Sequence, residues 1–441
     1  MAIALDRSKD GSQTAPAIPA DRKKNVKRTA AAGIVGSIIE FYDFTLFGLA
    51  AAVVFGPLFF PSQSPAAQTI SALLTFAIGY IGRPIGGIVF SHFGDRWGRK
   101  PMLLATLLIM GVSTLAIGML PTYQSVGLWA PALLAICRIV QGMGAGAEQV
   151  GTMVMMAENG GRKGLGLRIS LPGMGTFGGI VIATAVFAVV STLPEEALFS
   201  WGWRLPFFFA VITIAIGMWI RFGITETEEF SKVEDQGKVT KVPALEAIKQ
   251  QWNRILVGWG IAGPYLAFST LVQVYMLSYI TKTLGMPASF GLTANLVSSI
   301  LAVAGVPFFG WLTDKVGRVT VWLFSMLMFV VFGLTAFGLF GTGNELIIIA
   351  TMVLGLSIAL ASGYASHSVL LSRLFKPEHR LSGLVLVREP MSAFLAGPIA
   401  AVAAALVTAA GDKPWPVTLL FVGFAVIGAI TAFATRAWYK D

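Results

Sequence analysis

Apolar runs of about 20 residues recur along almost the whole chain, and this feature restricts the possible folds more than any other. A helix of that length crosses the hydrocarbon core of a bilayer, which is about 30 Å thick. Each crossing segment must be helical, because lipid offers backbone N–H and C=O groups no hydrogen-bond partner. Hydrophobic residues make up 55% of the 441 residues and charged residues only 12%, which leaves no room for a large soluble domain. The sequence therefore predicts an all-α polytopic membrane protein.

We expect twelve transmembrane helices in two pseudo-symmetric halves of six. The predicted helices of the first half are 30–58, 68–93, 101–120, 126–157, 165–192 and 203–222. Those of the second half are 253–281, 288–312, 319–341, 345–374, 381–410 and 415–437. The chain then divides into a flexible cytoplasmic tail (1–28), an N-terminal half (29–222), a cytoplasmic linker with some interfacial helix (223–252), a C-terminal half (253–437) and a cytoplasmic C-terminus (438–441).

The net charge of +10 does not indicate a nucleic-acid partner, because the basic residues follow a membrane pattern. When both termini and the even-numbered loops are placed on one side, that side holds 25 of the 32 Lys and Arg and the other side holds three. The remaining four, Arg83, Arg138, Arg168 and Arg388, fall inside apolar segments. This bias predicts a bacterial-type inner membrane protein with both termini in the cytoplasm. Cys137 is the only cysteine, which excludes a disulfide framework.

A short string occurs at corresponding places in the two halves. Residues 94–99 read G-D-R-W-G-R after the second predicted helix, and residues 313–318 read T-D-K-V-G-R after the eighth, 219 residues later. Two repeated halves around a central pathway are a common plan for transporters. The glycines permit a tight turn, while Asp and Arg hold neighbouring helix ends together, so a cytoplasmic gate is expected here. The predicted gating residues are Asp95, Arg99, Glu158, Arg162, Asp314 and Arg318.

Residues 91–100, S-H-F-G-D-R-W-G-R-K, resemble the signature loop of the major facilitator superfamily, and residues 138–146 resemble its helix-4 motif. A narrower resemblance, to the metabolite:proton symporter family, rests on E-F-Y-D-F at 40–44, R-P-I-G-G at 83–87, W-G-W-R-L-P-F at 201–207 and R-x-S-G at 380–383. Known members of that family carry shikimate, α-ketoglutarate, citrate, or proline and betaine. The resemblance implies the major facilitator fold and proton-driven uptake of a small polar metabolite, without a cofactor.

Two segments depart from the pattern of this family. Residues 146–151 read G-A-E-Q-V-G where the family usually has G-G-E-[WY]-G-G. Residues 388–390 read R-E-P where the family usually has an uncharged stretch. Both segments fall near the expected cavity, so they bear on the identity of the substrate and not on the class of protein.

Glu40 and Asp43 are the predicted proton-coupling residues. They lie three residues apart and therefore share one face of the first helix, at about mid-depth. Two neighbouring buried carboxylates do not ionise independently, which suits a proton-coupled carrier. The alternative is that one of them pairs permanently with Arg138 or Arg83. For Arg83 itself, which precedes Pro84, a local structural or gating role is expected.

Arg138 is expected either to hold a substrate carboxylate with both arms of its guanidinium or to neutralise Asp43. Alternation between the two partners would itself provide a mechanism. Glu148 fits a helix-packing partner and a ligand equally well. The remaining predicted substrate-binding residues are Gln141, Gln149, Tyr42, Gln273, Tyr275, Tyr279, Tyr364, His367 and Arg388. For the tyrosines and the histidine, a role in helix packing is the alternative.

Arg388 lies about 10 Å into the eleventh helix, counting 1.5 Å per residue. A guanidinium at that depth must reach the interface, pair with an acid or contact the solute. Glu389 points about 100° away around the helix and is expected to be poorly placed to neutralise it, while Pro390 leaves the carbonyl of Leu386 free. Arg388 is therefore expected either to bind a solute carboxylate opposite Arg138 or to form a structural pair.

The expected function is secondary active transport, namely proton-coupled uptake of a small polar metabolite, an organic acid anion, by alternating access. The alternatives are a proton-coupled antiporter or exporter of small organic compounds and a symporter of a zwitterion such as proline or betaine. No G-x-x-x-x-G-K-[ST] or H-E-x-x-H string occurs, so neither an ATP-driven pump nor a metalloenzyme is expected. The internal repeat argues against an intramembrane enzyme. The expected partners are a small solute, protons and membrane lipid, with the protein acting as a monomer.

Overall fold

The computed structural model describes residues 20–61, 65–159, 164–223, 243–376 and 380–436. Within these ranges all regular structure is helical and no strand occurs. Twelve helical runs in the same ranges are long and apolar enough to cross a membrane. The predicted fold class, an all-α protein with twelve transmembrane helices, is therefore confirmed.

The N-terminal half contains the first six spans. Its first three are built from α1 (Ala20–Ala50), the π-helical turn η1 (Ala51–Phe55), α2 (Gly56–Phe59), α3 (Pro65–Trp97) and α4 (Arg99–Met119). The next three are built from α5 (Tyr123–Val126), α6 (Trp129–Asn159), α7 (Leu165–Val190), α8 (Glu195–Ser200), η2 (Gly202–Arg204), α9 (Leu205–Phe208) and α10 (Ala210–Phe222).

The C-terminal half contains the other six spans and more π-helical turns. The first three are built from α12 (Pro243–Thr270), η3 (Leu271–Tyr275), α13 (Met276–Ser278), η4 (Tyr279–Thr283), α14 (Ala288–Val316) and α15 (Arg318–Phe340). The last three are built from α16 (Glu345–Val353), η5 (Leu354–Leu360), α17 (Ala361–Ser372), α18 (Arg380–Met391), η7 (Ser392–Ala396), α19 (Ile399–Ala409) and α20 (Trp415–Ala434).

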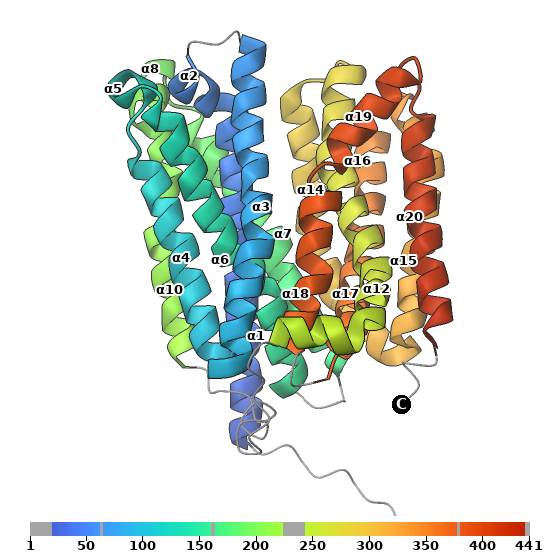
Figure 1. Cartoon of the computed structure of the whole chain (residues 1–441). Helices are drawn as coiled ribbons and strands as arrows, with labels where there is room; N and C mark the ends of the chain where they lie inside the picture. The colour runs from blue at the N-terminus through green and yellow to red at the C-terminus, as the bar shows by residue number, and fades with distance from the viewer. Residues whose placement is uncertain (1–19, 62–64, 160–163, 224–242, 377–379, 437–441) are drawn as a thin grey trace, which may run out of the picture.

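The two halves stand side by side, with the blue-to-green spans on one side and the yellow-to-red spans on the other (Figure 1). They meet where α7 packs against α14 and α17, and where α3 packs against α18. The start of α1 and the end of α20 lie at the same end of the bundle (Figure 1). We call this end the lower face; it is the one that the distribution of basic residues predicts to be cytoplasmic.

The repeated string forms the same turn in both halves. α3 continues to Trp97 and α4 begins at Arg99, so most of the string expected to form a loop is helical and only Gly98 makes the turn. Gly98 has φ 105°, and Gly317, at the same place between α14 and α15, has φ 94°. Only glycine adopts such a backbone conformation readily. The two halves therefore share this turn in structure as well as in sequence.

Glycine also lets the halves approach each other closely near the lower face. A Cβ atom on Gly166 of α7 would collide with the carbonyl oxygen of Gly310 on α14, and a Cβ on Gly310 would collide with Ser170. Small residues at a crossing allow two membrane helices to pack backbone against backbone. This crossing draws the two halves together beside the turns of the repeated string.

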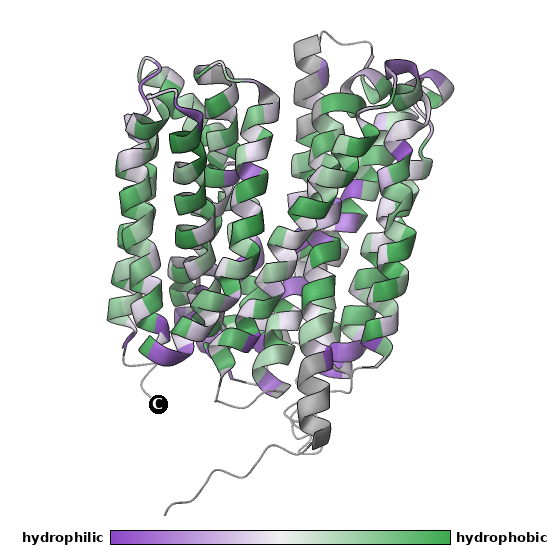
Figure 2. Ribbon diagram, turned by 180° about the vertical axis from the view of Figure 1, so that it is seen from behind, coloured by the Kyte–Doolittle hydropathy of each residue, from purple (hydrophilic) through white to green (hydrophobic). Residues whose placement is uncertain are grey.

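The outer surface of the bundle is apolar, as expected for contact with lipid. Figure 2 shows hydrophobic residues over the outside of the helices and hydrophilic residues at their ends and at points in the interior. Large apolar side chains such as Trp219, Leu346 and Phe394 are exposed. The interior hydrophilic groups therefore have no access to lipid, and they are the candidates for function.

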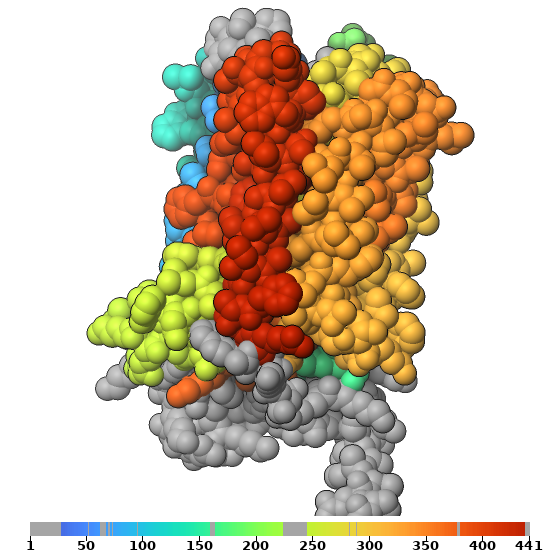
Figure 3. Space-filling view, turned by 90° about the vertical axis from the view of Figure 1, so that its right-hand side faces the viewer, coloured from blue at the N-terminus to red at the C-terminus, as the bar shows by residue number. Residues whose placement is uncertain are grey.

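The first turns of α12 lie across the lower face, not along the bundle (Figure 1). Non-helical dihedrals at Gln251, φ −134° and ψ 27°, mark the bend into the seventh span. Leu245, Ile248 and Trp252 are exposed on this segment, which projects from the side of the bundle in Figure 3. An exposed apolar face with a Trp suits the membrane interface. The rest of the predicted linker, 224–242, lies outside the described residues.

Candidate functional site

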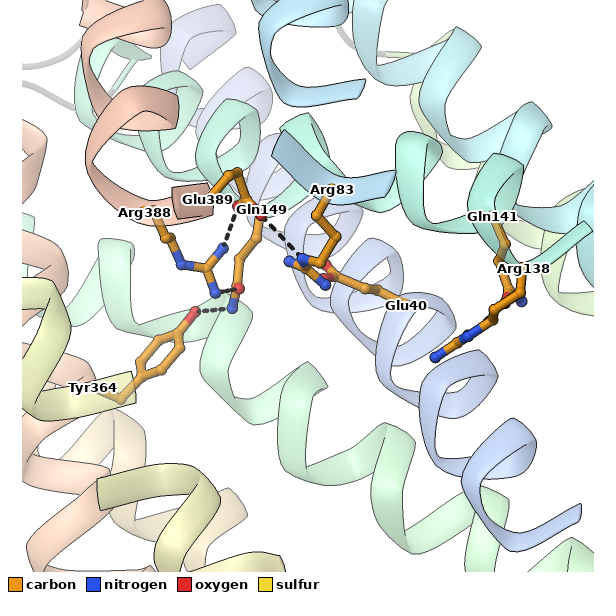
Figure 4. A network of polar contacts seen from close by, with 8 residues as sticks. All are labelled: Glu40, Arg83, Arg138, Gln141, Gln149, Tyr364, Arg388 and Glu389. Carbon is orange, nitrogen blue, oxygen red and sulfur yellow. Dashed lines mark hydrogen bonds and ion pairs between the residues drawn. The ribbon is translucent and has the colours of Figure 1, made fainter. Parts of the chain in front are cut away.

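A chain of buried charged side chains joins the two halves (Figure 4). It begins at Glu40 on α1, whose Oε1 lies 2.9 Å from Nη1 of Arg83 on α3. Nε of Arg83 donates to Oε2 of Glu389 on α18 at 3.0 Å. Arg83 thus binds one acid of each half, and all three residues are buried. In this conformation Glu40 has the arginine partner that the sequence allowed as an alternative to proton coupling.

This series of buried side chains continues through Arg388. Its Nη1 lies 3.6 Å from Oε1 of Glu389, and its Nη2 donates to the side-chain oxygen of Gln149 on α6. The amide of Gln149 donates to the hydroxyl of Tyr364 on α17 at 3.3 Å. Three of the predicted substrate-binding residues, Arg388, Gln149 and Tyr364, are thereby brought together from both halves.

The expectation that Glu389 is poorly placed to neutralise Arg388 is wrong. The backbone positions differ by about 100° around the helix, but both side chains are long enough to turn along the helix surface toward each other. The same segment holds a second contact that sequence did not predict. The indole of Trp259 on α12 donates to the carbonyl of Leu386 at 3.1 Å, which is the carbonyl that Pro390 leaves without an intrahelical donor.

A second buried group lies entirely within the N-terminal half and contains Asp43. The hydroxyl of Thr114 on α4 lies 2.6 Å from Oδ2 of Asp43. The amide of Gln141 on α6 donates to the oxygen of Thr114 at 2.6 Å. Nη1 of Arg138 donates to the side-chain oxygen of Gln141 at 2.5 Å. Arg138 and Asp43 are therefore linked through two neutral side chains and form no direct ion pair among the described contacts.

Arg138 and Asp43 each keep an unused polar atom in this arrangement. Nη2 of Arg138 and Oδ1 of Asp43 are buried and have no hydrogen-bond partner in the described part of the protein. The guanidinium carbon of Arg138 lies 4.2 Å from the ring centre of Phe44 and 4.4 Å from that of Phe47. The aromatic faces stabilise the cation without consuming its hydrogen-bond donors. Of the two predicted roles of Arg138, direct neutralisation of Asp43 is not the one that this conformation adopts.

Glu148 acts as a helix-packing partner. It pairs with Arg221 on α10, and Thr106 on α4 donates to its other oxygen at 2.9 Å. Arg221 also donates to the carbonyl of Leu103 at 2.9 Å. All of these residues belong to the N-terminal half, and this neutral pair is separate from the chain between the halves.

Several predicted substrate-binding residues lie apart from these groups. The hydroxyl of Tyr42 donates to the carbonyl of Pro206 at 2.7 Å, and its side chain is fully buried. The ring of Tyr279 packs on Phe337 of α15, with ring centres 5.1 Å apart. Tyr275 lies against Tyr279, and Gln273 donates to Ser269 of its own helix. None of these contacts requires a solute.

His367 packs edge to face against Tyr364, with ring centres 5.6 Å apart. Its Nδ1 lies 2.9 Å from the carbonyl of Tyr364 and 3.1 Å from that of Gly363, both on its own helix. Its ring stacks on Tyr265 with centres 4.1 Å apart. These contacts match the packing alternative for this histidine.

The predicted gate forms contacts across the lower face. Oε1 of Glu158, at the end of α6, lies 3.5 Å from Nη2 of Arg99 and 3.3 Å from Nη1 of Arg380. Arg380 begins α18, so Glu158 ties the N-terminal half to the C-terminal half. Asp314, at the end of α14, accepts from the backbone N–H of Gly166 at 2.7 Å and of Leu167 at 3.0 Å. These contacts join the two halves at the lower face.

Three predicted gating residues are less fully described. Arg162 and the side chain of Asp95 lie outside the described residues. Arg318 is the first residue of α15, directly after the turn at Gly317. Across the described chain, no three His, Cys, Asp or Glu residues gather in a way that could hold a metal ion.

Sequence reasoning missed the roles of Arg380, Glu389 and Thr114. Arg380 stands out in the sequence only as part of a family string, and Thr114 carries no charge that distinguishes it from other hydroxyl residues of a membrane helix. Glu389 did carry a signal, because an acid inside an apolar helix requires a partner. Its partner, Arg83, lies 306 positions away in the sequence, and no local pattern connects the two.

A bundle of twelve spans in two repeated halves, with charges buried between them and ion pairs across one face, defines a membrane transport protein. The chain matches the model of the sugar (and other) transporter family over residues 29–241 and that of the major facilitator superfamily over residues 265–441. The chain belongs to the major facilitator superfamily. Its families and relatives are transporters and not enzymes.

Relatives of known name support this assignment. An inner membrane metabolite transport protein of Escherichia coli is 37% identical over 80% of this chain and 81% of its own. The shikimate transporter of the same organism is 30% identical over 93% of this chain and 94% of its own. The proline/betaine transporter of Escherichia coli is 31% identical over 93% of this chain and 83% of its own. Among solved structures, the proton:xylose symporter bound to 6-bromo-6-deoxy-D-glucose shares the fold, with a TM-score of 0.79 at 15% identity, covering 95% of this chain and 97% of that one.

Proposed function

We propose that this transporter takes up a small organic acid anion together with a proton, by alternating access. The observation that carries the proposal is the balance of charge in a central cluster, defined as the six buried acids and arginines of the two groups above. They are the arginines Arg83, Arg138 and Arg388 and the acids Glu40, Asp43 and Glu389. With all six ionised, their formal charges cancel.

This balance explains why an anion and a proton would travel together. An uncompensated charge inside the membrane costs several kcal/mol. An anion that enters alone leaves the cluster negative, and a proton that enters alone leaves it positive. A monoanion with one proton on one of the three carboxylates keeps the balance, so the two are favoured as a pair.

Of the two predicted proton-coupling residues, Asp43 is better suited than Glu40. Glu40 lies 2.9 Å from the guanidinium of Arg83, so its negative charge already has a compensating partner. The described partner of Asp43 is the neutral hydroxyl of Thr114. Oδ1 of Asp43 and Oε2 of Glu40 both lack a hydrogen-bond partner among the described residues, so the neutral partner of Asp43 is the feature that favours it.

The contacts at the lower face fit alternating access. If this face is cytoplasmic, as the basic residues predict, the protein is closed to the cytoplasm and the cluster becomes reachable from outside when the other end opens. Inward opening must then break the contacts of Glu158 and Asp314 across the halves. Import follows from proton binding on the acidic outer side and proton release on the cytoplasmic side.

A zwitterion is the second candidate solute, and a specific observation favours it. Arg388 and Glu389 lie 3.6 Å apart and present one charge of each sign. This arrangement matches the two charges of proline or betaine. In addition, one relative is a proline/betaine transporter.

Uptake into sealed vesicles tests the proposal. Purified protein is reconstituted, the outside is made acidic, and accumulation of radiolabelled shikimate, α-ketoglutarate, citrate, proline and betaine is measured. We expect accumulation of a carboxylic acid anion that a protonophore abolishes. Accumulation that ignores the protonophore, or that occurs only when the proton gradient is reversed, would contradict symport, and selective accumulation of proline or betaine would establish the second candidate.

A further inference from the structure

Two buried polar atoms face each other at the boundary of the halves without forming a hydrogen bond. They are Nη1 of Arg388 and Oε1 of Glu389, 3.6 Å apart. Neither atom has a hydrogen-bond partner among the described residues, and the side chains are 10% and 0% exposed. The other oxygen of Glu389 is bound by Arg83 at 3.0 Å. Glu389 is therefore held firmly by Arg83 and only loosely by Arg388.

Further donors surround the loose contact. The amide nitrogen of Gln149 lies 3.3 Å from the hydroxyl of Tyr364, and its oxygen is held by Nη2 of Arg388. Figure 4 shows Arg388, Gln149 and Tyr364 converging from three helices, with Glu389 between Arg388 and Arg83. An ionised carboxylate has two oxygens with about four acceptor positions. A guanidinium, an amide and a hydroxyl are donors that suit it.

We infer that Glu389 is an internal counter-ion, which a carboxylate of the solute replaces at Arg388. The inference rests on the proposed uptake of an organic acid anion and names the site where its carboxylate binds. The solute accepts from Nη1 of Arg388, with Gln149 and Tyr364 beside it, while Glu389 stays bound to Arg83. The solute carboxylate thereby compensates the positive charge of Arg388, which Glu389 compensates in the empty protein.

The two distances explain why the solute wins this exchange. A direct N–H···O bond between a guanidinium and a carboxylate is short, about 2.7–2.9 Å, and roughly twice as strong as a bond between neutral groups. The 3.6 Å separation from Glu389 provides charge but no hydrogen bond. Replacing it gains hydrogen bonds, and Glu389 does not become an isolated charge, because Arg83 keeps its other oxygen.

Glu389 also has a role when no solute is bound. A buried guanidinium without a counter-ion is strongly unfavourable, and Arg388 must cross from one conformation to the other with the empty protein. Glu389 supplies the missing negative charge during that step. Because it competes with the solute, it also lowers the affinity of the site, which helps a carrier to release what it binds.

Carboxylate binding to the detergent-purified full-length protein tests this role. Tryptophan fluorescence is titrated with shikimate, α-ketoglutarate and citrate at constant pH, for wild type and Glu389→Gln. The substitution keeps the size and removes the competing charge, so we expect the affinity for the carboxylate that wild type binds to rise at least tenfold. Glu148→Gln is the matched control, since it neutralises another buried acid that pairs with Arg221 outside the site, and its affinity should remain that of wild type.

A second variant covers the case in which Glu389→Gln fails to fold, as judged by gel filtration. Glu389→Asp keeps the charge but is too short to reach both arginines, so its affinity for the carboxylate should rise by a smaller factor. An unchanged or weaker affinity in every variant that folds overturns the inference, as does the absence of carboxylate binding in every protein. Proline or betaine binding that is lost in Glu389→Gln also overturns it, because Glu389 then binds the solute's cation.

The outcome is separable from that of the proposed function. The titration uses no membrane and no gradient, so it decides whether Glu389 competes for Arg388. Proton coupling is decided by vesicle uptake in wild type. A tighter carboxylate site in Glu389→Gln with uptake that ignores the proton gradient would uphold the counter-ion and reject symport.

Discussion

Asp314 of the C-terminal half accepts a hydrogen bond from the backbone N–H of Gly166, the second residue of α7 in the N-terminal half, at 2.7 Å. The N–H groups of the first turn of a helix have no partner within the helix, and an acid placed there is also favoured by the helix dipole. A side chain at the end of α14, in the C-terminal half, thus caps α7 of the N-terminal half. Such a contact is suited to a gate, because it is complete only when the two halves are together.

Asp314→Ala should therefore weaken the closed state of the lower face. We expect the affinity for solute to change by no more than about 150-fold, because couplings of this kind typically amount to about 1–3 kcal/mol. The measurement is the rate at which a thiol reagent labels Ser170→Cys in a Cys137→Ser background, since Ser170 is buried on α7 close to Gly310. Labelling should become faster. Asp412→Ala, between α19 and α20 at the opposite end, is the control, and equal rates in the two variants would argue against a gate at Asp314.

Asp43→Asn tests the proton-coupling residue. The amide preserves the size of the side chain and a contact with Thr114, but it cannot take up a proton. We expect accumulation against a gradient to be abolished, while exchange of solute at equal concentrations survives at least in part. Both are measured in the same vesicles. Accumulation that remains at the wild-type level would remove Asp43 from the coupling step and leave Glu40 or Glu389 to carry the proton.

Arg388→Lys tests the planar guanidinium. In the structure, one arm of Arg388 binds Gln149 while the other faces Glu389. Lysine keeps the charge but has no fork that can hold two groups in fixed directions. We expect carboxylate binding to weaken at least tenfold in a protein that still elutes as a folded species. If Arg388→Lys and Arg388→Gln both bind as tightly as wild type, Arg388 is structural and Arg138 must provide the anion preference.

Arg221→Met tests the buried pair within the N-terminal half. Removing one partner of a buried ion pair leaves the other charge uncompensated and typically costs about 3–5 kcal/mol. We expect a clearly lower midpoint of thermal unfolding in detergent. The double substitution Arg221→Met with Glu148→Gln leaves no lone charge and should recover part of the loss. A single variant as stable as wild type would mean that Glu148 finds another partner or takes up a proton.

The sequence predicted the twelve spans and the repeated turns because these depend on local properties. Each apolar run is long enough to cross the bilayer whatever its neighbours do, so the spans are visible one at a time. The turn at Gly98 is also local, since its positive φ requires glycine. Two predicted boundaries are wrong: α3 remains helical as far as Trp97, and α1 already begins at Ala20, within the segment expected to be a flexible tail.

The candidate site was predicted only in part. Charged residues within apolar segments stand out in any sequence, and the sequence identified Glu40, Asp43, Arg138 and Arg388 in this way. Apart from Arg83, which the sequence allowed as a partner of Glu40, it did not identify their partners. Arg388 binds Gln149 and faces Glu389, and Arg138 donates to Gln141, whereas the sequence offered for Arg388 either a place opposite Arg138 around one solute or a structural pair.

The sequence by itself determined that this protein spans a membrane twelve times and buries acids and arginines there, because the bilayer acts on each segment separately. Only the tertiary structure decided that Arg83 joins Glu40 to Glu389, that Tyr42 donates to the carbonyl of Pro206, and that Asp314 caps α7. Such pairings depend on which helices are neighbours and on the rotation of each helix about its axis. Both are set by side-chain packing across the bundle, and neither leaves a periodic pattern along the chain.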